Sequence, residues 1–478
     1  MDVRPKTAGH AGGVRVGTFV ASRDSRARRA FAGAWLWTCL AVLAALPAAA
    51  QGVSQGIAGR VHEGVASCAG SACHGRAVAS GPDIRHDEIR IWQDSTGPAG
   101  AHSRAWRVLA ELRAQAIASR LGLGKAQAAP ECLGCHADHP AARGALFQIS
   151  DGVGCEACHG GSSAWLASHY ALSVKHADNV AKGMIPLEDA KVRAAVCLDC
   201  HFGAAGPGQF VTHQIMSAGH PRIVFELDLF STLQKHYDLG PNYASRKPIP
   251  SGVKLWAVGQ AMALDRSLTL FDDPRRGQEG AFPEFYFFDC HSCHRTITDD
   301  PRARPTAVMN PGRPVPSGTV PYNDENMIML SAAAAVAAPK LATQFDTDCR
   351  AFHVALATDR SSAIRAAGQL ARSARALSNA FAAHDFGRAE TIGILGHVVS
   401  GAQGARYTDY AGSAQAVMAI DTLLNALVTS GELDLARAQA LRPDIDRAYQ
   451  AVSDPNGYRP AEFRAAIARI AVAIRTLE

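Results

Sequence analysis

The sequence predicts a mainly α-helical protein built from two regions of different composition. In the first 300 residues, cysteines occur in close pairs with a histidine directly after the second one, and glycine and proline are dense. From residue 345 onward the chain is rich in Ala, Arg and Leu at helical spacing. Six prolines between residues 301 and 321 separate the two regions. We therefore expect short helices and loops, then an extended linker, then an α-helical bundle.

Residues 1–50 have the pattern of a secretory signal peptide. Basic residues between Arg23 and Arg29 precede an apolar run from Phe31 to about Leu46, and an A-x-A-like cleavage site ends at Ala50. The run is about 16 residues long, whereas a membrane-spanning helix needs about 20. We therefore expect cleavage and export to the periplasm, with an uncleaved anchor as the alternative. We expect no later segment to be apolar enough to span a membrane or to insert stably into one.

The rest of the chain divides into three expected parts. These are a cysteine-rich domain at residues 51–300, a proline-rich linker or strap at 301–330, and the bundle at 331–478. The formal charge of +5 comes from the N-terminus, because removing the seven Lys/Arg and two Asp/Glu of residues 1–50 from 48 and 43 leaves 41 of each. A mature chain of zero net charge has no overall excess of positive charge to attract the phosphates of nucleic acid, so we exclude nucleic acid as a partner.

Four cysteine pairs have the spacing C-x-x-C-H. They are Cys132-Leu-Gly-Cys135-His136, Cys155-Glu-Ala-Cys158-His159, Cys197-Leu-Asp-Cys200-His201 and Cys290-His-Ser-Cys293-His294. This spacing lets two thiols reach the two vinyl groups on one edge of a porphyrin, while the adjacent histidine binds the iron as proximal ligand. Four repeats of so specific a pattern predict several covalently bound haem c groups.

Zinc is the alternative to haem as the group that these cysteines bind. Nineteen residues separate Cys135 from Cys155, which fits the spacing of a zinc ribbon. A zinc ribbon does not require a histidine after each second cysteine, yet all four pairs have one. Zinc-thiolate sites are also less expected in an exported protein, so we favour haem.

A fifth site is irregular. In Cys68-Ala-Gly-Ser-Ala-Cys73-His74, four residues separate the thiols instead of two. Gly70 and Ser71 permit the loop to bulge, so both sulfurs can still reach one porphyrin edge. The alternatives are attachment through Cys73 alone, or a Cys68–Cys73 disulfide that leaves His74 unused. We expect a fifth haem here.

Five proximal histidines occupy one axial position on each of five haem irons, so the second axial position of each iron still needs a ligand. Histidines 353, 384 and 397 lie in the helical region, and His291 lies inside an attachment loop. Nine others are candidates for distal ligands: His62, His86, His102, His139, His169, His176, His213, His220 and His236. We expect most of these nine to be used, without assigning each to an iron.

Local context ranks five of the nine. His102 opens an amphipathic pattern that continues to residue 117 and suits a stop at residue 122, so it can lean over a haem from a helix start. His169 follows His159 closely enough to cap a nearby haem. His213 and His220 are seven residues apart, near two turns if that stretch is helical, and His236 follows the apolar run 223–233.

Several segments resemble the multihaem cytochrome c family: His102-Ser-Arg-Ala-Trp-Arg-Val-Leu109, Pro130-Glu-Cys-Leu-Gly-Cys-His136 and Gly154-Cys-Glu-Ala-Cys-His-Gly160. That family includes the tetrahaem cytochrome of ammonia oxidisers and shares haem-pair packing with hydroxylamine oxidoreductase. Two further segments look similar to a branch of exported members: Ala218-Gly-His-Pro-Arg-Ile-Val-Phe-Glu-Leu227 and Phe288-Asp-Cys-His-Ser-Cys-His294. The resemblance covers roughly residues 66–296. The expanded site at residues 68–74 departs from the pattern.

This resemblance implies closely stacked haems, most with two axial histidines. It implies distal roles for five residues: His102, His169, His213, His220 and His236. Five haems within about 240 residues also leave about 50 residues each, too few for a conventional core around every haem. We therefore expect the porphyrins themselves to form the core of this domain, wrapped by short helices and loops.

Helical periodicity in the last third of the chain predicts six helices. Their expected ranges are 345–358, 361–383, 386–400, 408–429, 433–450 and 460–477. Gly431, Pro443, Pro455 and Pro460 fall near the breaks. This bundle has no haem motif, and we expect it to pack against the haem domain. Met327, Met329 and Cys349 are interpreted as packing residues rather than ligands.

Two functions compete. Five closely spaced haems with two histidines each predict an electron-transfer protein whose partners are other redox proteins, among them a quinol-oxidising membrane complex. The alternative is a haem oxidoreductase that acts on a small nitrogen or sulfur compound at one five-coordinate iron. The irregular site at His74 motivates this alternative.

Overall fold

The computed structural model describes residues 60–81, 85–277, 284–294, 314–316, 319–404, 407, 409–455 and 457–477. The signal-peptide prediction and half of the range 301–330 expected as a proline-rich linker lie outside these residues. Helices hold 60% of the described residues and strands 2%, so the predicted mainly α fold is confirmed. All the described residues fall within one compact unit.

The cysteine-rich region is built from short helices. Its α-helices are α3 (Glu88–Trp92), α4 (Ala101–Arg104), α5 (Leu112–Arg120), α6 (Pro130–His136), α7 (Cys155–His159), α8 (His176–Ala181), α9 (Ala190–His201), α10 (His213–Ser217), α11 (Leu227–Leu233) and α12 (Pro241–Ala244). Its 3-10 turns are η1 (Val65–Ser67), η2 (Pro98–Gly100), η3 (Arg107–Ala110), η4 (Ala126–Ala128), η5 (Ile149–Asp151), η6 (Phe285–Phe287) and η7 (Cys290–Ser292). Two short parallel strands, β1 (Val61–His62) and β2 (Ala142–Arg143), pair Val61 with Ala142 and His62 with Arg143.

The single helix expected from His102 to residue 117 is wrong. The segment forms α4, then η3, then α5, because Glu111 adopts an extended backbone that ends η3 and begins α5. This break lets Leu109 and Ala118 enter the same small core, where both are buried. The expected stop is confirmed, because α5 ends at Arg120 and Gly122 has a φ of 68°, which favours glycine.

The six helices predicted in the last third are present, with ends that shift by a few residues. They are α15 (Pro339–Leu356), α16 (Arg360–Ala383), α17 (Arg388–Gln403), α18 (Tyr410–Thr429), α19 (Leu435–Ala451) and α20 (Pro460–Ile474). A seventh helix, α14 (Glu325–Ala337), precedes them. It turns residues 325–330 from expected linker into buried helix, in which Met327 and Met329 are core residues as interpreted. Cys349 is buried in α15.

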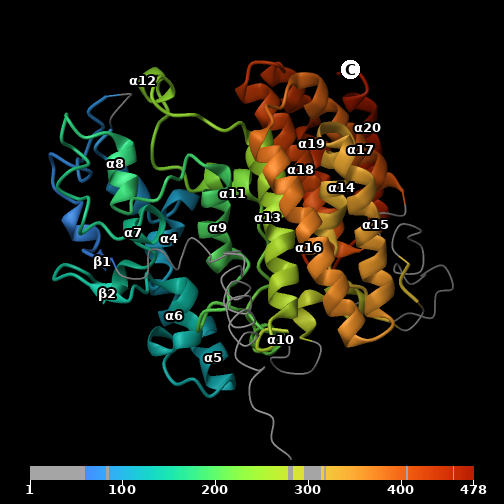
Figure 1. Cartoon of the computed structure of the whole chain (residues 1–478), viewed down its shortest axis with the longest axis horizontal. Helices are drawn as coiled ribbons and strands as arrows, with labels where there is room; N and C mark the ends of the chain where they lie inside the picture. Colours follow the sequence, from blue (N-terminus) through green and yellow to red (C-terminus); the bar gives the residue numbers. More distant parts are fainter. Residues whose placement is uncertain are drawn as a thin grey trace, which may run out of the picture. The chain divides into compact units, whose positions relative to one another are not determined.

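A long helix that the sequence analysis did not predict organises the molecule. α13 (Gly252–Asp272) is capped at its N-terminus by Ser251, whose side-chain oxygen accepts a hydrogen bond from the Lys254 backbone at 3.2 Å. It is buried on nearly every side, so it lacks the one-sided periodicity by which amphipathic helices are recognised. Although α13 lies in the range assigned to the haem domain, it packs along α14, α16 and α18 (Figure 1).

α13 also connects the bundle to the cysteine-rich region. It contacts α9 and α11 on its other side, and Gly259 lets Leu227 of α11 approach its backbone, since a Cβ there would lie 2.6 Å from the Cβ of Leu227. From α13, Arg266 donates hydrogen bonds to Asp199 (2.8 Å) and to the carbonyl of Gly203 (2.7 Å). These contacts hold the end of α9, which contains Cys197, Cys200 and His201, against the helical bundle.

One helix among the described residues, α18, is long and apolar enough to cross a membrane by length and composition alone. In this fold 78% of its apolar window is buried inside the protein. The expectation that no segment after residue 50 is apolar enough was therefore too strict. The burial of α18 agrees with a core helix of the bundle.

Candidate haem centres

Three of the four regular motifs end short α-helices. The histidine closes α6, α7 and α9 at His136, His159 and His201. Residues i, i+3 and i+4 of a helix share one face, so each of these helices presents both thiols and the imidazole toward the same side. The fourth motif lies on η7, where the Asp289 carboxylate accepts hydrogen bonds from the backbone of Ser292 (2.8 Å) and His291 (3.3 Å).

The irregular loop of residues 68–74 is a compact turn. The Cys73 backbone donates to the Gly70 carbonyl (2.8 Å), and the His74 backbone donates to the Cys68 carbonyl (3.2 Å). Cys68 and Cys73 are not joined by a disulfide in this structure. Cys73 is exposed, and the partly exposed ring of His74 faces a second imidazole.

Each of the five predicted proximal histidines faces one of the five predicted distal histidines. The ring centres of every pair lie between 6.0 and 6.4 Å apart. The pairs are His74 with His169 (6.3 Å), His102 with His201 (6.0 Å), His136 with His220 (6.3 Å), His159 with His236 (6.4 Å) and His213 with His294 (6.2 Å). The fold therefore brings together segments up to 99 residues apart in the sequence, as for His102 and His201.

This spacing fits an iron ligated from both sides. An imidazole nitrogen lies about 2 Å from a metal that it ligates and about 1.1 Å from its own ring centre, so two ligands on opposite sides have centres about 6.2 Å apart. Direct stacking or a hydrogen bond between two imidazoles would bring the rings closer. The residues present therefore fit five bis-histidine haems, in which the histidine of each of the four C-x-x-C-H motifs and of the expanded motif would hold the iron together with its partner, and the cysteines would hold the porphyrin edge.

Hydrogen bonds orient half of these rings for ligation through Nε2. In five of the ten histidines, Nδ1 lies within hydrogen-bonding distance of a backbone carbonyl or a carboxylate. The contacts are His74 to Glu88 (3.1 Å), His136 to Ala105 (2.9 Å), His169 to Leu166 (2.6 Å), His220 to Pro221 (2.8 Å) and His236 to Gln234 (3.1 Å). A proton on Nδ1 leaves Nε2 with its lone pair, which is the usual arrangement of metal-bound histidine.

Burial keeps several of these imidazoles neutral. It lowers the pKa of His159 and of His201 to about 4, and each has a neighbouring histidine that acts in the same direction. Burial also lowers the pKa of His102, His220 and His236. A metal binds the neutral imidazole, so the electrostatics of these positions agree with a role as ligands.

The four remaining candidates are engaged differently or lie apart from the pairs. His62 is buried and 2.7 Å from Asp138, whereas His86 contacts Ser80 at 2.7 Å. His176 uses Nε2, the atom that would otherwise face a metal, to contact Glu188 at 2.6 Å. None of these three, nor His139, faces a proximal histidine in the part of the chain that the structure describes.

The helical interpretation of residues 213–220 is corrected. α10 ends at Ser217, and Gly219 has a φ of 116°, a conformation that favours glycine. Arg113 donates to the Gly219 carbonyl at 2.7 and 3.1 Å and so holds this turn in place. His213 and His220 therefore leave the segment in different directions and serve different pairs.

The attachment loops lie next to one another in an order that differs from the sequence. Cys68 and Cys155 pack against the same small apolar cluster, Cys158 interacts electrostatically with Cys197, and the Cys200 thiol donates to the carbonyl of Gly134, the residue before Cys135, at 3.8 Å. The segment 213–220 then joins the His136 site to the His294 site, because it supplies the second imidazole to both. The five sites therefore follow one another in the order His74, His159, His201, His136, His294.

A zinc ribbon is not formed. Cys135 approaches Cys200, and Cys155 approaches Cys68, so the two pairs that fit the ribbon spacing do not meet. Among the described ranges, no group of three or more His, Cys, Asp or Glu side chains is arranged to hold a metal ion. The donors are instead arranged as thiols beside paired imidazoles.

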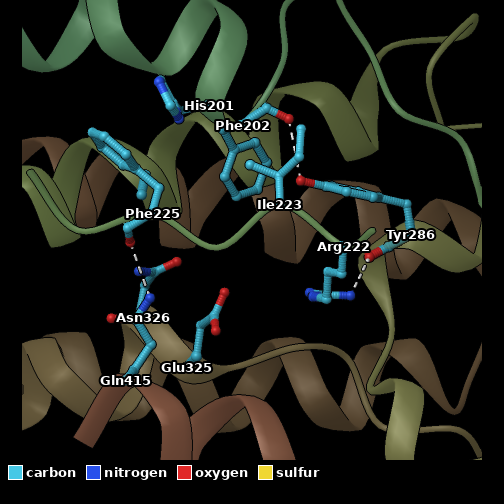
Figure 2. Close-up of a pocket in the computed structure, with 10 residues that line it drawn as sticks. His201, Phe202, Arg222, Ile223, Phe225, Tyr286, Glu325, Asn326 and Gln415 are labelled. Atoms are coloured by element: carbon cyan, nitrogen blue, oxygen red, sulfur yellow. Dashed lines mark hydrogen bonds between the residues drawn. The ribbon is translucent and has the colours of Figure 1, made fainter. Parts of the chain in front are cut away.

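Three residues of these centres escaped the sequence analysis. Glu88 contacts Nδ1 of His74, and Glu156, inside a C-x-x-C loop, accepts backbone hydrogen bonds from Glu63 (2.9 Å), Gly64 (2.7 Å) and Ser162 (2.7 Å). Arg222 lines a small cavity between His201 and the bundle (Figure 2). The position of Glu156 within the motif was its only signal in the sequence, because a lone charge in a loop is usually solvated.

Comparison with known proteins agrees with this geometry. Residues 67–160, which contain three of the five attachment loops, match the family model described as cytochrome c554 and c-prime. No curated protein and no solved structure matches the chain. The match covers about a fifth of the chain, and it supports a c-type cytochrome that binds haem covalently and transfers electrons.

Proposed function

We propose that this protein is an exported multihaem c-type cytochrome that transfers electrons through five covalently bound, bis-histidine haems. The observation that carries the proposal is the set of five histidine pairs with ring centres 6.0–6.4 Å apart. Each pair contains the histidine of one attachment motif. We extend the family likeness of residues 67–160 to the other two motifs and to a relation with the ammonia-oxidiser tetrahaem cytochrome.

A haem held between two imidazoles exchanges single electrons and has no open position for a substrate. The residues of the chain determine where such centres lie. The thiols of neighbouring motifs lie beside one another at the contacts of Cys68 with Cys155 and of Cys135 with Cys200. Attachment points that close support porphyrins near enough to pass electrons along the order His74, His159, His201, His136, His294.

The competing oxidoreductase function needs an iron without a second protein ligand. The irregular loop was the main candidate, yet His74 faces His169 at 6.3 Å, the same spacing as in the regular sites. Their rings are also nearly parallel, with an interplanar angle of 16°. This observation supports electron transfer over small-molecule chemistry at the irregular site.

Export and partners follow from the sequence pattern. Arg23–Arg29, the apolar run and Ala50 support a signal peptide and a periplasmic location. Other exported redox proteins and a quinol-oxidising membrane complex are the partners we propose. Neither proposal depends on nucleic acid or on stable membrane insertion of the mature chain.

A haem count tests the proposed function most directly. Intact mass of the purified mature protein should show five covalent haems, and Cys158→Ala should weaken or abolish the attachment of one. Cys349→Ala is the matched control, because it removes a buried cysteine outside every motif. A wild-type protein without covalent haem, or an unchanged haem-to-protein ratio in Cys158→Ala, would contradict the assignment.

Spectroscopy separates the two functions. Five bis-histidine irons should be entirely low-spin at room temperature, and the reduced protein should be indifferent to carbon monoxide. A high-spin signal, or a carbon monoxide adduct that forms without denaturation, would instead support the oxidoreductase.

A further inference from the structure

A small cavity lies between the His201 site and the helical bundle. Figure 2 shows His201 and Phe202 on one side and Glu325, Asn326 and Gln415 on the other. Arg222 extends into it from the segment that follows His220. A guanidinium remains protonated at any ordinary pH, so Arg222 brings a permanent positive charge into this cavity.

The contacts of Arg222 lead to the attachment loop of the His294 site. Its Nη1 lies 3.1 Å from the sulfur of Cys290 and 3.4 Å from the carbonyl oxygen of Tyr286. The guanidinium carbon also lies 5.5 Å from the centre of the Tyr286 ring, a cation–π distance. A sulfur, a carbonyl and an aromatic ring solvate a cation partly, but none of them carries a compensating charge.

Glu325 is the acidic side chain that faces Arg222 across the cavity (Figure 2). Its carboxylate accepts a hydrogen bond from the Asn323 amide at 3.0 Å instead of binding the guanidinium. Within the described residues, no carboxylate oxygen lies within 4.0 Å of an Arg222 nitrogen. The positive charge beside Cys290 is therefore only partly offset.

We infer that Arg222 raises the reduction potential of the haem attached at Cys290 and Cys293. The inference rests on the proposed function, because it requires a haem at that motif. Once the Cys290 thiol is bonded to the porphyrin edge, the guanidinium stays beside that edge in a partly buried setting, where charges interact more strongly than in water. A positive charge there stabilises the reduced haem, which carries one more electron, and so favours electron flow toward the His294 site.

The bundle has a defined part in this arrangement. Asn326 of α14 donates to Gln260 of α13 (2.7 Å), and Gln260 donates to Gln415 of α18 (3.1 Å). This chain of amides fixes the floor of the cavity beneath Arg222. The helical bundle would thus position a charge next to one haem, although it contains no haem motif itself.

A purely structural role for Arg222 predicts a different result. If the guanidinium only braced Tyr286, its loss would reduce stability or haem loading without changing the potential of a loaded haem. Lysine would replace it poorly in that role, because it lacks the planar fork. A role through charge predicts the opposite, namely that lysine rescues the potential.

Redox titration of the purified, haem-loaded protein tests the inference. Arg222→Met and Arg222→Gln should shift one of the five one-electron components to lower potential and leave the other four unchanged. Arg222→Lys should stay near wild type. The control Arg365→Gln, which removes an exposed arginine of α16 bonded to Ser361 and Ser362, should change none. All five components unchanged in both neutral variants, with haem present on the Cys290–Cys293 peptide, would overturn the inference.

Haem mapping separates this inference from the proposed function. A wild-type Cys290–Cys293 peptide without haem would refute the proposed fifth centre, and the inference with it. If neither neutral variant keeps its haem, Arg222→Lys provides the test. The midpoint potential of one haem in Arg222→Lys must then fall more steeply than in wild type as pH rises, because the lysine loses its proton. An equal pH dependence in the two proteins would overturn the inference.

Discussion

Glu226 should make the stability of this protein fall as pH rises. It caps α11, where its carboxylate accepts hydrogen bonds from the backbone of Asp228 (2.9 Å) and Leu229 (2.7 Å) and from the Thr422 hydroxyl of α18 (2.9 Å). It is 1% exposed, and no cation neutralises it among these contacts. Burial, reinforced by Asp228, raises the pKa of Glu226 from 4.5 to about 7.

The sign and size of the effect follow from proton linkage. Between pH 4.5 and 7 the folded protein keeps the proton on Glu226 while the unfolded chain releases it, so the folded state binds more protons there. Stability from this group is complete below the unfolded pKa and is lost as pH rises through the folded pKa. The loss amounts to about 3 kcal/mol between pH ~4 and pH ~8. Asp228, whose pKa burial raises to about 6, adds a contribution of the same sign.

Glu226→Gln removes this dependence while keeping an oxygen for the cap. Unfolding by denaturant, followed by circular dichroism at pH 5, 7 and 8, should show the variant gaining about 3 kcal/mol relative to wild type over that range. Glu111→Gln, at an exposed carboxyl that makes no cap, is the control. A difference between wild type and Glu226→Gln that stays constant with pH would refute the reasoning, because the carboxyl would then be ionised throughout.

Two further predictions concern the histidine pairs and the central helix. The rings of His159 and His236 are perpendicular (90°), whereas those of His74 and His169 are nearly parallel (16°), so electron paramagnetic resonance should resolve a strongly anisotropic low-spin signal beside a rhombic one. Perpendicular planes leave two iron d orbitals nearly equal in energy, and five identical signals would contradict the geometry. Trp256→Ala should destabilise the helical bundle by about 3–5 kcal/mol because the side chain is fully buried, and a loss below about 1 kcal/mol in denaturant unfolding would argue against that packing.

The geometry of the cysteine motifs and the helices of the bundle could be predicted because their signals are local. A C-x-x-C-H motif places two thiols and an imidazole on one turn of chain, whatever the rest of the fold does, as in α6, α7 and α9. Most helices of the bundle show one-sided periodicity for a similar reason, since they expose one face to water, whereas α18 is largely buried. α13 was missed because it is apolar on nearly every side, and a buried helix lacks that contrast.

The sequence also selected the five histidines that face the motif histidines in the structure, through their context and through family resemblance, but it could not pair them. His102 faces His201, and His169 faces His74 rather than the nearby His159. Only the path of the chain in space decides such pairings, because an imidazole must meet its partner at about 6 Å and sequence distance says nothing about that separation.

Tertiary structure alone revealed the surroundings of three charged residues. Glu226, Arg222 and Glu156 stand as single charges among uncharged neighbours in the sequence, a pattern that usually marks a solvated surface. Their significance appears when burial and neighbours are known: Glu226 is 1% exposed, Glu156 is 3% exposed, and Arg222 touches the sulfur of Cys290. The motifs predicted to attach haem covalently consist of adjacent residues, so the sequence alone determines them. The electrostatic environment of each centre depends on which distant segments pack around it, and only the tertiary structure decides that.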